Sequence, residues 1–142
     1  PSLNSITHLI NSSGLFVTFD NGTQRSWQVA RKHLYTYNNG VILSISGNHS
    51  ENGVTSISEW GTNRFGRTFY TSTPVPVVIR QDCSFRVTSG QVKHELPNFM
   101  ATATFGLNAE GNATTCPGSG SYYYKLTWTG PSGNSKTLIL PY

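Results

Sequence analysis

The chain has 142 residues, of which 36% are hydrophobic and only 11% are charged, and its net charge is +4. This length fits one domain spanning residues 1–142. The charged fraction is far below the roughly 25% of an ordinary soluble domain, and its polar character comes instead from 17 Ser, 17 Thr and 12 Asn. An aromatic content of 12% excludes a disordered chain. The scattered basic residues exclude the clustered basic patch of a nucleic-acid-binding protein.

The sequence holds no apolar run of the roughly 18 to 20 residues needed to span a bilayer. It starts at Pro1 and shows no signal-peptide core. We therefore expect a chain processed or cut from a longer precursor, with membrane attachment only through a lipid anchor lost with the removed segment.

Alternation of apolar and polar residues with a period of two runs through most of the chain and predicts strands joined by short turns. Residues 1–11 are expected to form an extended arm. In chain order, the predicted strands lie within residues 15–19, 24–35, 41–45, 57–60, 67–73, 77–79, 85–87, 91–96, 99–107, 122–129 and 136–140. The turns between them carry Asn-Gly, Asn-Asn-Gly, Ser-Gly or Pro-Ser-Gly-Asn sequences, and residues 108–120 read as a loop.

Two local signals refine this pattern. Pro74 and Pro76 lack the N–H donors of a ladder, so their segment is predicted to be a sheet edge or a crossover. Ser89-Gly90 is predicted to be a hairpin turn. No segment requires a helix, and the sequence therefore predicts an all-β fold: an antiparallel sandwich, a barrel or an extended meander of about ten strands.

The two cysteines, Cys83 and Cys116, lie beside turn sequences and are 33 positions apart. This spacing fits neither a C-x-x-C redox motif nor a tetrahedral zinc site. We predict a disulfide between them, which would contribute roughly 3 to 4 kcal/mol and indicate an oxidising compartment. The alternative is two buried free thiols.

Several motifs occur in a characteristic order. The turn at residues 61–66 (Gly-Thr-Asn-Arg-Phe-Gly) precedes Cys83 and the strand at 85–90, and Cys116 precedes a strand that ends at residues 133–140. This order resembles the C-terminal half of a group of Thr-rich cell-envelope proteins and lipoproteins of Bacteroidota, whose members have no assigned activity.

The resemblance covers residues from about 15 to 142 and includes Asp20–Thr23, Trp27 and the basic residues 31–33. The chain departs from the group in lacking its N-terminal half and in the Thr-Cys-Pro-Gly sequence at 115–118. The resemblance implies a location that is secreted, at the cell surface or on the outer membrane facing the periplasm. It also implies a fold class, and it implies no chemistry.

Catalytic and cofactor-binding patterns are missing from the sequence. Glu51 and Glu59 are the closest carboxylates to a catalytic pair, and they flank a turn. The four histidines (His8, His33, His49 and His94) show no metal-binding spacing, and no nucleophile-elbow or phosphate-loop sequence occurs. We therefore expect no enzyme activity, no cofactor and no metal.

The candidate ligand-binding residues are aromatic or stand beside aromatic residues: Trp60, Arg64, Tyr122, Tyr123 and Tyr124. Three consecutive tyrosines cannot all face one side of a strand, so at least one ring must point away from the others. The alternative is that these rings fill the core.

Two functions remain open. The first is a structural or adhesive component of an envelope assembly, in which other envelope proteins or copies of the chain complete open sheet edges and residues 1–11 serve as a donated strand. The second is a carbohydrate-binding module that stacks exposed aromatic rings on glycans.

Overall fold

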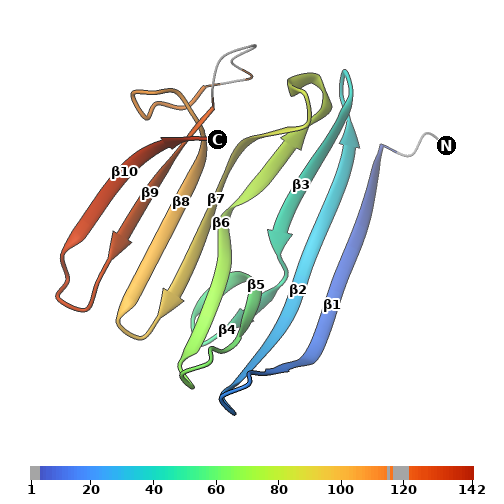
Figure 1. The fold of residues 1–142 in the computed structure, drawn as a ribbon. Helices are drawn as coiled ribbons and strands as arrows, with labels where there is room; N and C mark the ends of the chain where they lie inside the picture. Colours follow the sequence, from blue (N-terminus) through green and yellow to red (C-terminus); the bar gives the residue numbers. More distant parts are fainter. Residues whose placement is uncertain (1–3, 115, 117–121) are drawn as a thin grey trace.

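The computed structural model describes residues 4–114, 116 and 122–142, which form one antiparallel sheet (Figure 1). Its elements are β1 (Ser5–Thr18), β2 (Gln24–Tyr37), β3 (Val41–Gly47), β4 (His49–Glu51), β5 (Val54–Thr62), β6 (Thr68–Arg80), the 3₁₀ turn η1 (Gln81–Cys83), β7 (Arg86–Leu96), β8 (Phe99–Leu107), β9 (Tyr123–Thr129) and β10 (Ser135–Pro141). The all-β prediction is confirmed. Residues 1–3 of the expected arm and 115 and 117–121 of the expected loop lie outside the described residues.

No helix among the described residues has both the length and the apolar character to cross a membrane.

Across the width of the sheet there are eight strand positions, which we call lanes, from β1 at one edge to β10 at the other. From β6 to β10 the chain is a meander, in which each strand pairs with the next. On the other side, β3 and β5 lie end to end in one lane between the long strands β2 and β6. The result is a single layer.

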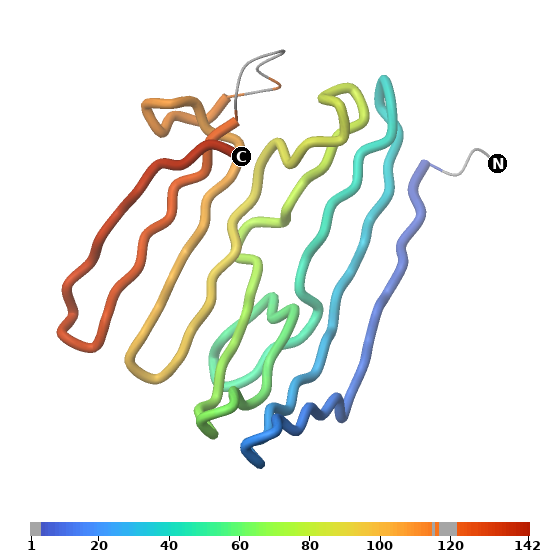
Figure 2. The backbone as a smooth tube through the Cα atoms, in the orientation of Figure 1, coloured from blue at the N-terminus to red at the C-terminus, as the bar shows by residue number. Residues whose placement is uncertain are grey.

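The lane shared by β3 and β5 is interrupted by a hairpin excursion over residues 48–56, which can be followed in Figure 2. The chain leaves the sheet after Gly47 and returns at Ile57, with Ser56 at a φ of 55°. A Cβ at position 47 would overlap the backbone carbonyl of Ser56. Only glycine therefore fits where the two arms of the excursion cross.

The prediction that Pro74 and Pro76 mark an edge or a crossover is wrong, because they lie inside the central strand β6. Among the described residues, β6 pairs with β3 only over residues 77–80 and with β5 only over residues 68–72. On that side the prolines face the gap left by the excursion, where no ladder needs their missing N–H groups.

The hairpin predicted at Ser89-Gly90 is also wrong, because β7 runs without a turn through both residues. Gly90 has a φ of 126°, and a Cβ there would lie 2.5 Å from the Cα of Val77. The glycine thus serves the close approach of β6 and β7 at a register shift.

The segment expected to be an extended arm is not detached from the sheet: from Ser5 onward it pairs with another strand. It is the first part of β1, paired with β2 of the same chain from Ser5 against Thr36 to Thr18 against Gln24. The 14-residue strand β2 offers an outer edge long enough to pair the whole segment, which satisfies its backbone groups.

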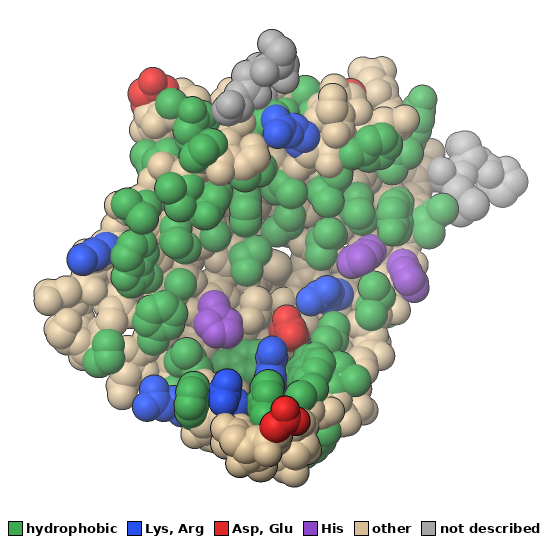
Figure 3. Space-filling model, in the orientation of Figure 1, with side chains coloured by type: hydrophobic (Ala, Val, Ile, Leu, Met, Phe, Trp, Pro, Cys, Tyr) green, Lys and Arg blue, Asp and Glu red, His purple; other side chains and the backbone are tan. Residues whose placement is uncertain are grey.

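The register divides the sheet into two faces of different character. The apolar face carries Ile6, Ile10, Val17, Tyr35, Val41, Leu43, Ile45, Ile79, Val92, Ala101, Ala103, Phe105, Leu126, Trp128, Leu138 and Leu140. Figure 3 shows a face on which hydrophobic side chains gather over the upper part and charged and histidine side chains gather lower down.

The polar face carries hydroxyl, amide and charged side chains that bond across the strands. Thr127 and Thr137 lie 3.0 Å apart through their hydroxyls, and Gln91 donates to Thr104 at 3.0 Å. The hairpin excursion packs on this face, where Ile57 is fully buried.

Nothing in the described chain covers the apolar face. The accessible surface is 8687 Å², about 1,400 Å² more than a compact globular protein of 15.6 kDa would expose. Among residues 4–114, 116 and 122–142, six hydrophobic residues are buried: Ala30, Ile57, Phe69, Cys83, Leu107 and Tyr122. A domain normally packs two layers around a core, and this sheet supplies one.

Candidate functional site

A concave site that contains two arginines lies where the β1–β2 turn, the β5–β6 turn and the end of β7 meet at one end of the sheet. It is a cavity of about 350 Å³, which we call the arginine cavity. Its lining residues are Phe19, Arg25, Asn63, Arg64, Phe69, His94 and Leu96.

The β5–β6 turn is built to present Arg64. The side-chain oxygen of Asn63 accepts hydrogen bonds from the backbone N–H groups of Phe65 at 2.9 Å and Arg67 at 3.0 Å. This fixes the turn around Arg64. The Arg64 guanidinium lies 4.9 Å from the ring of Phe19 and 5.5 Å from that of Phe65, within the range of cation–π contacts.

Arg25 enters the cavity from β2 and is held by aromatic rings. Its guanidinium lies 4.9 Å from the Trp27 ring and 5.5 Å from the Phe69 ring. Glu59 approaches Arg25 at 3.8 Å and Arg31 at 3.5 Å, so one carboxylate is shared between two guanidiniums. These side chains are partly exposed, and such pairs contribute little to stability.

His94 forms part of the cavity wall on β7. Its Nδ1 lies 2.9 Å from the Thr71 hydroxyl, and its ring lies 5.7 Å from that of Phe69. Burial lowers the pKa of His94 most; Glu59 raises it and Arg25 lowers it. A lowered pKa favours the neutral imidazole, so the two arginines carry most of the positive charge of the cavity.

The predicted ligand-binding residues do not form one platform. Trp60 lies on the polar face, stacked on His49 at 3.8 Å with an interplanar angle of 6°. Arg64 instead lines the arginine cavity on the side of the apolar face. The excursion brings His49 onto Trp60 and so covers part of the ring that we expected to be open.

Tyr123 points away from Tyr122 and Tyr124, whose rings both contact Tyr142, as the alternation predicted. Tyr122 is only 1% exposed and lies under the Arg86 guanidinium at 4.8 Å. Tyr124 lies on the apolar face, 5.7 Å from the ring of Phe105, and the register places Tyr123 on the polar face. Tyr122 therefore belongs to the small core.

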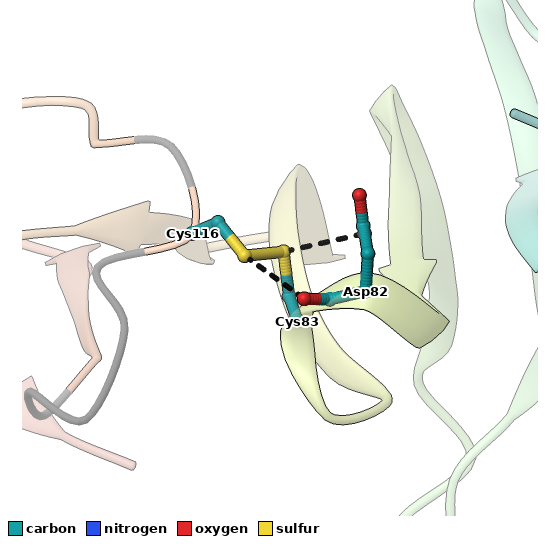
Figure 4. Close-up of side chains that lie close together, drawn as sticks. All are labelled: Asp82, Cys83 and Cys116. Atoms are coloured by element: carbon teal, nitrogen blue, oxygen red, sulfur yellow. Dashed lines mark hydrogen bonds between the residues drawn. A yellow bond between two sulfur atoms is a disulfide. The ribbon is translucent and has the colours of Figure 1, made fainter. Parts of the chain in front are cut away.

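The predicted disulfide between Cys83 and Cys116 is present in the structure (Figure 4). It ties the β8–β9 loop to η1, which joins β6 to β7. Asp82 lies beside it, with sulfur–oxygen contacts of 3.5 Å. Asp82 also pairs with Arg80, whose hydrogen bond lowers the pKa of the carboxyl group. Because the two sulfurs are bonded to each other, neither is a thiolate available to a metal.

The carboxylates of Glu51 and Glu59 belong to opposite faces. Glu51 lies in the excursion, where its side chain accepts a hydrogen bond from the Tyr70 hydroxyl at 3.1 Å. Glu59 lies between arginines on the other face. The two do not face one cleft.

Comparison of the chain with protein-family models, with curated proteins and with solved structures gave no match. The fold and the site thus define a class by geometry alone: a disulfide-linked, single-layer antiparallel sheet with one polar and one uncovered apolar face.

Sequence reasoning found Arg64 but missed its neighbours in the cavity. Phe19, Arg25, Phe69 and His94 come from segments up to 75 positions apart, and only the strand order brings them together. The sequence offered one weak signal. Arg25 and Trp27 are two positions apart and so lie on one face of a predicted strand, which places a charge among apolar groups.

Proposed function

We propose that this chain is a non-catalytic, secreted or cell-surface β protein that serves as a structural or adhesive component of an envelope assembly. The observation that carries the proposal is the uncovered apolar face. Large exposed apolar patches on soluble proteins are typically sites of interaction.

The size of the apolar face supports a stable contact. Eight lanes spaced about 4.8 Å apart, each with at least seven residues at about 3.4 Å per residue, span roughly 900 Å². A standard protein interface buries about 800 Å² on each partner. A second sheet packed about 10 Å above this one would complete a two-layer core.

The edge strand β1 supports assembly as well. Its 14 residues include no Lys, Arg, Asp, Glu or Pro, the residues that usually protect a free edge. Ile6 is 59% exposed and Leu9 is 52% exposed. By contrast, the shorter edge strand β10 carries Lys136 and Pro141. β1 is thus the edge better suited to accept a strand from another envelope protein or from a copy of the chain.

The disulfide supports the proposed location, and the low charge supports assembly. Disulfides persist in oxidising compartments outside the cytosol, and the resemblance to Bacteroidota envelope proteins implies the same location. A charged fraction of 11% also reduces repulsion between neighbouring subunits in an assembly.

A pair of variants on β10 tests the proposal. Leu138 lies on the apolar face and is 48% exposed, whereas its neighbour Ile139 lies on the polar face and is 37% exposed. We expect Leu138→Lys to weaken both self-association, measured by light scattering, and binding of an apolar fluorescent dye, whereas Ile139→Lys changes neither. A wild-type monomer that binds no dye, or equal effects of the two variants, would contradict the proposal.

A further inference from the structure

We propose that the arginine cavity is a binding site for a small organic anion, namely a carboxylate carried on a sugar ring or an aromatic ring. This inference goes beyond the proposed function and does not depend on it. It rests on the charge, the floor and the size of the cavity.

The charge around the cavity is unbalanced. Arg25 and Arg64 both line it, and no Asp or Glu is among its lining residues. Glu59 is the carboxylate beside Arg25, at 3.8 Å, but it is shared with Arg31. Arg64 makes no ion pair with any of the residues that the structure describes. A guanidinium recognises a carboxylate with two parallel hydrogen bonds, so an anion placed here would accept hydrogen bonds from Arg64.

The floor of the cavity is apolar. The Phe69 ring is 3% exposed and is held by packing, and Phe19 and Leu96 form the flanking walls. A ligand ring in the cavity would contact the partly exposed Phe19 and Leu96, and its carboxylate would meet the guanidinium of Arg25 or Arg64. Sites for small molecules commonly combine such an apolar lining with a few polar groups that set the orientation.

The volume sets the size of the ligand. About 350 Å³ lies at the lower end of the range for small-molecule sites, which suits one ring with its substituents and not an extended chain. The turns at Phe19 and Arg64 place the cavity at the end of the sheet, so a partner on the upper part of the apolar face would leave it open.

The state of His94 bears on which residues attract the anion. Because burial lowers the pKa of His94 and so favours its neutral form, attraction of an anion there depends mainly on the arginines that line the cavity. His94 and Asn63 remain as polar groups for hydroxyl substituents on the ring. Replacing Arg64 alone should therefore remove a large part of the affinity.

The experiment titrates the oxidised full chain with glucuronate and with phenylacetate, and with the neutral analogues glucose and phenylacetamide. Binding is followed by NMR and by the fluorescence of Trp27 beside Arg25. Loss of a charge-assisted hydrogen bond predicts that Arg64→Gln weakens binding of the anion by roughly 10- to 100-fold. The matched control is Arg67→Gln, which removes the same charge from the same turn outside the cavity and should stay within about twofold of wild type.

The two anions distinguish the sources of the carboxylate. Binding of glucuronate alone identifies a sugar acid, binding of phenylacetate alone identifies an aromatic acid, and binding of both identifies a general carboxylate site. The proposal is overturned if neither anion binds at millimolar concentration, or if the neutral analogues bind equally well. Equal losses in Arg64→Gln and Arg67→Gln would also overturn it, because that pattern reflects surface charge alone. Circular dichroism confirms that both variants remain folded.

Discussion

Removing the disulfide between Cys83 and Cys116 is expected to lower the free energy of unfolding by about 4 kcal/mol. The bond joins residues 33 positions apart, and the chain-entropy relation gives that value for a closed loop of this length. For a chain of 142 residues, an unfolding entropy of about 2.1 cal/mol/K per residue converts this loss into a fall in Tm of roughly 13 °C.

The assay is urea denaturation of the wild type and of the Cys83→Ala/Cys116→Ala double variant, followed by circular dichroism and by fluorescence. Wild-type protein treated with a reductant is the control and should match the double variant within about 1 kcal/mol. A difference below about 1 kcal/mol between oxidised and reduced protein would refute the reasoning. It would mean that the unfolded chain already holds the two segments together.

Three further predictions concern the excursion, the edge and the histidines. Gly47→Ala should destabilise the fold by more than about 3 kcal/mol in urea denaturation, because its Cβ would overlap the Ser56 carbonyl. Leu9→Lys should reduce self-association measured by analytical ultracentrifugation, because it adds charge to the unprotected edge of β1, whereas Ile139→Lys on β10 should not. The pKa of His94 is lowered in the fold, so below pH about 6.5 the unfolded chain binds more protons than the native chain. Stability should therefore fall as the pH drops through this range, and His94→Gln should flatten the profile in pH-dependent thermal melts.

Each of these predictions has a contrary outcome. A Gly47→Ala protein as stable as the wild type would mean that the arms of the excursion do not cross as described. Equal association of the Leu9→Lys and Ile139→Lys variants would remove β1 as a docking edge. An unchanged pH profile in His94→Gln would show that burial of this ring does not govern the acid side of the stability curve.

The sequence predicted most of the strands and the disulfide correctly, because both depend on local or covalent signals, but it did not predict β4 or the part of β1 before residue 15. Alternation from Phe99 to Leu107 predicts β8 residue by residue. Local signals misled at Pro74 and Gly90, which look like strand breakers and instead lie within β6 and β7. Their role depends on the gap beside β6 and on the approach of its backbone, and neither can be seen without the neighbouring strand.

The alternation of apolar and polar residues could not predict that the sheet forms a single layer. A strand such as β9 alternates in the same way whether its apolar side faces a second sheet or solvent. The arginine cavity was equally hidden, because Arg25, Arg64 and His94 come from three segments that meet only through the strand order. Trp60 was correctly placed in a strand, but its contact with His49 depends on the path of the excursion.

The exposure of the apolar face in the isolated chain is the property that most needs measuring. A soluble paramagnetic agent added to methyl-labelled protein reports the solvent contact of individual side chains. At a dilution where the mass is 15.6 kDa, the methyls of Val41 and Leu138 should relax strongly while that of Ile57 stays protected. Protection of Val41 and Leu138 in that monomer would mean that the face is already covered, and an open single-layer sheet would no longer describe this protein.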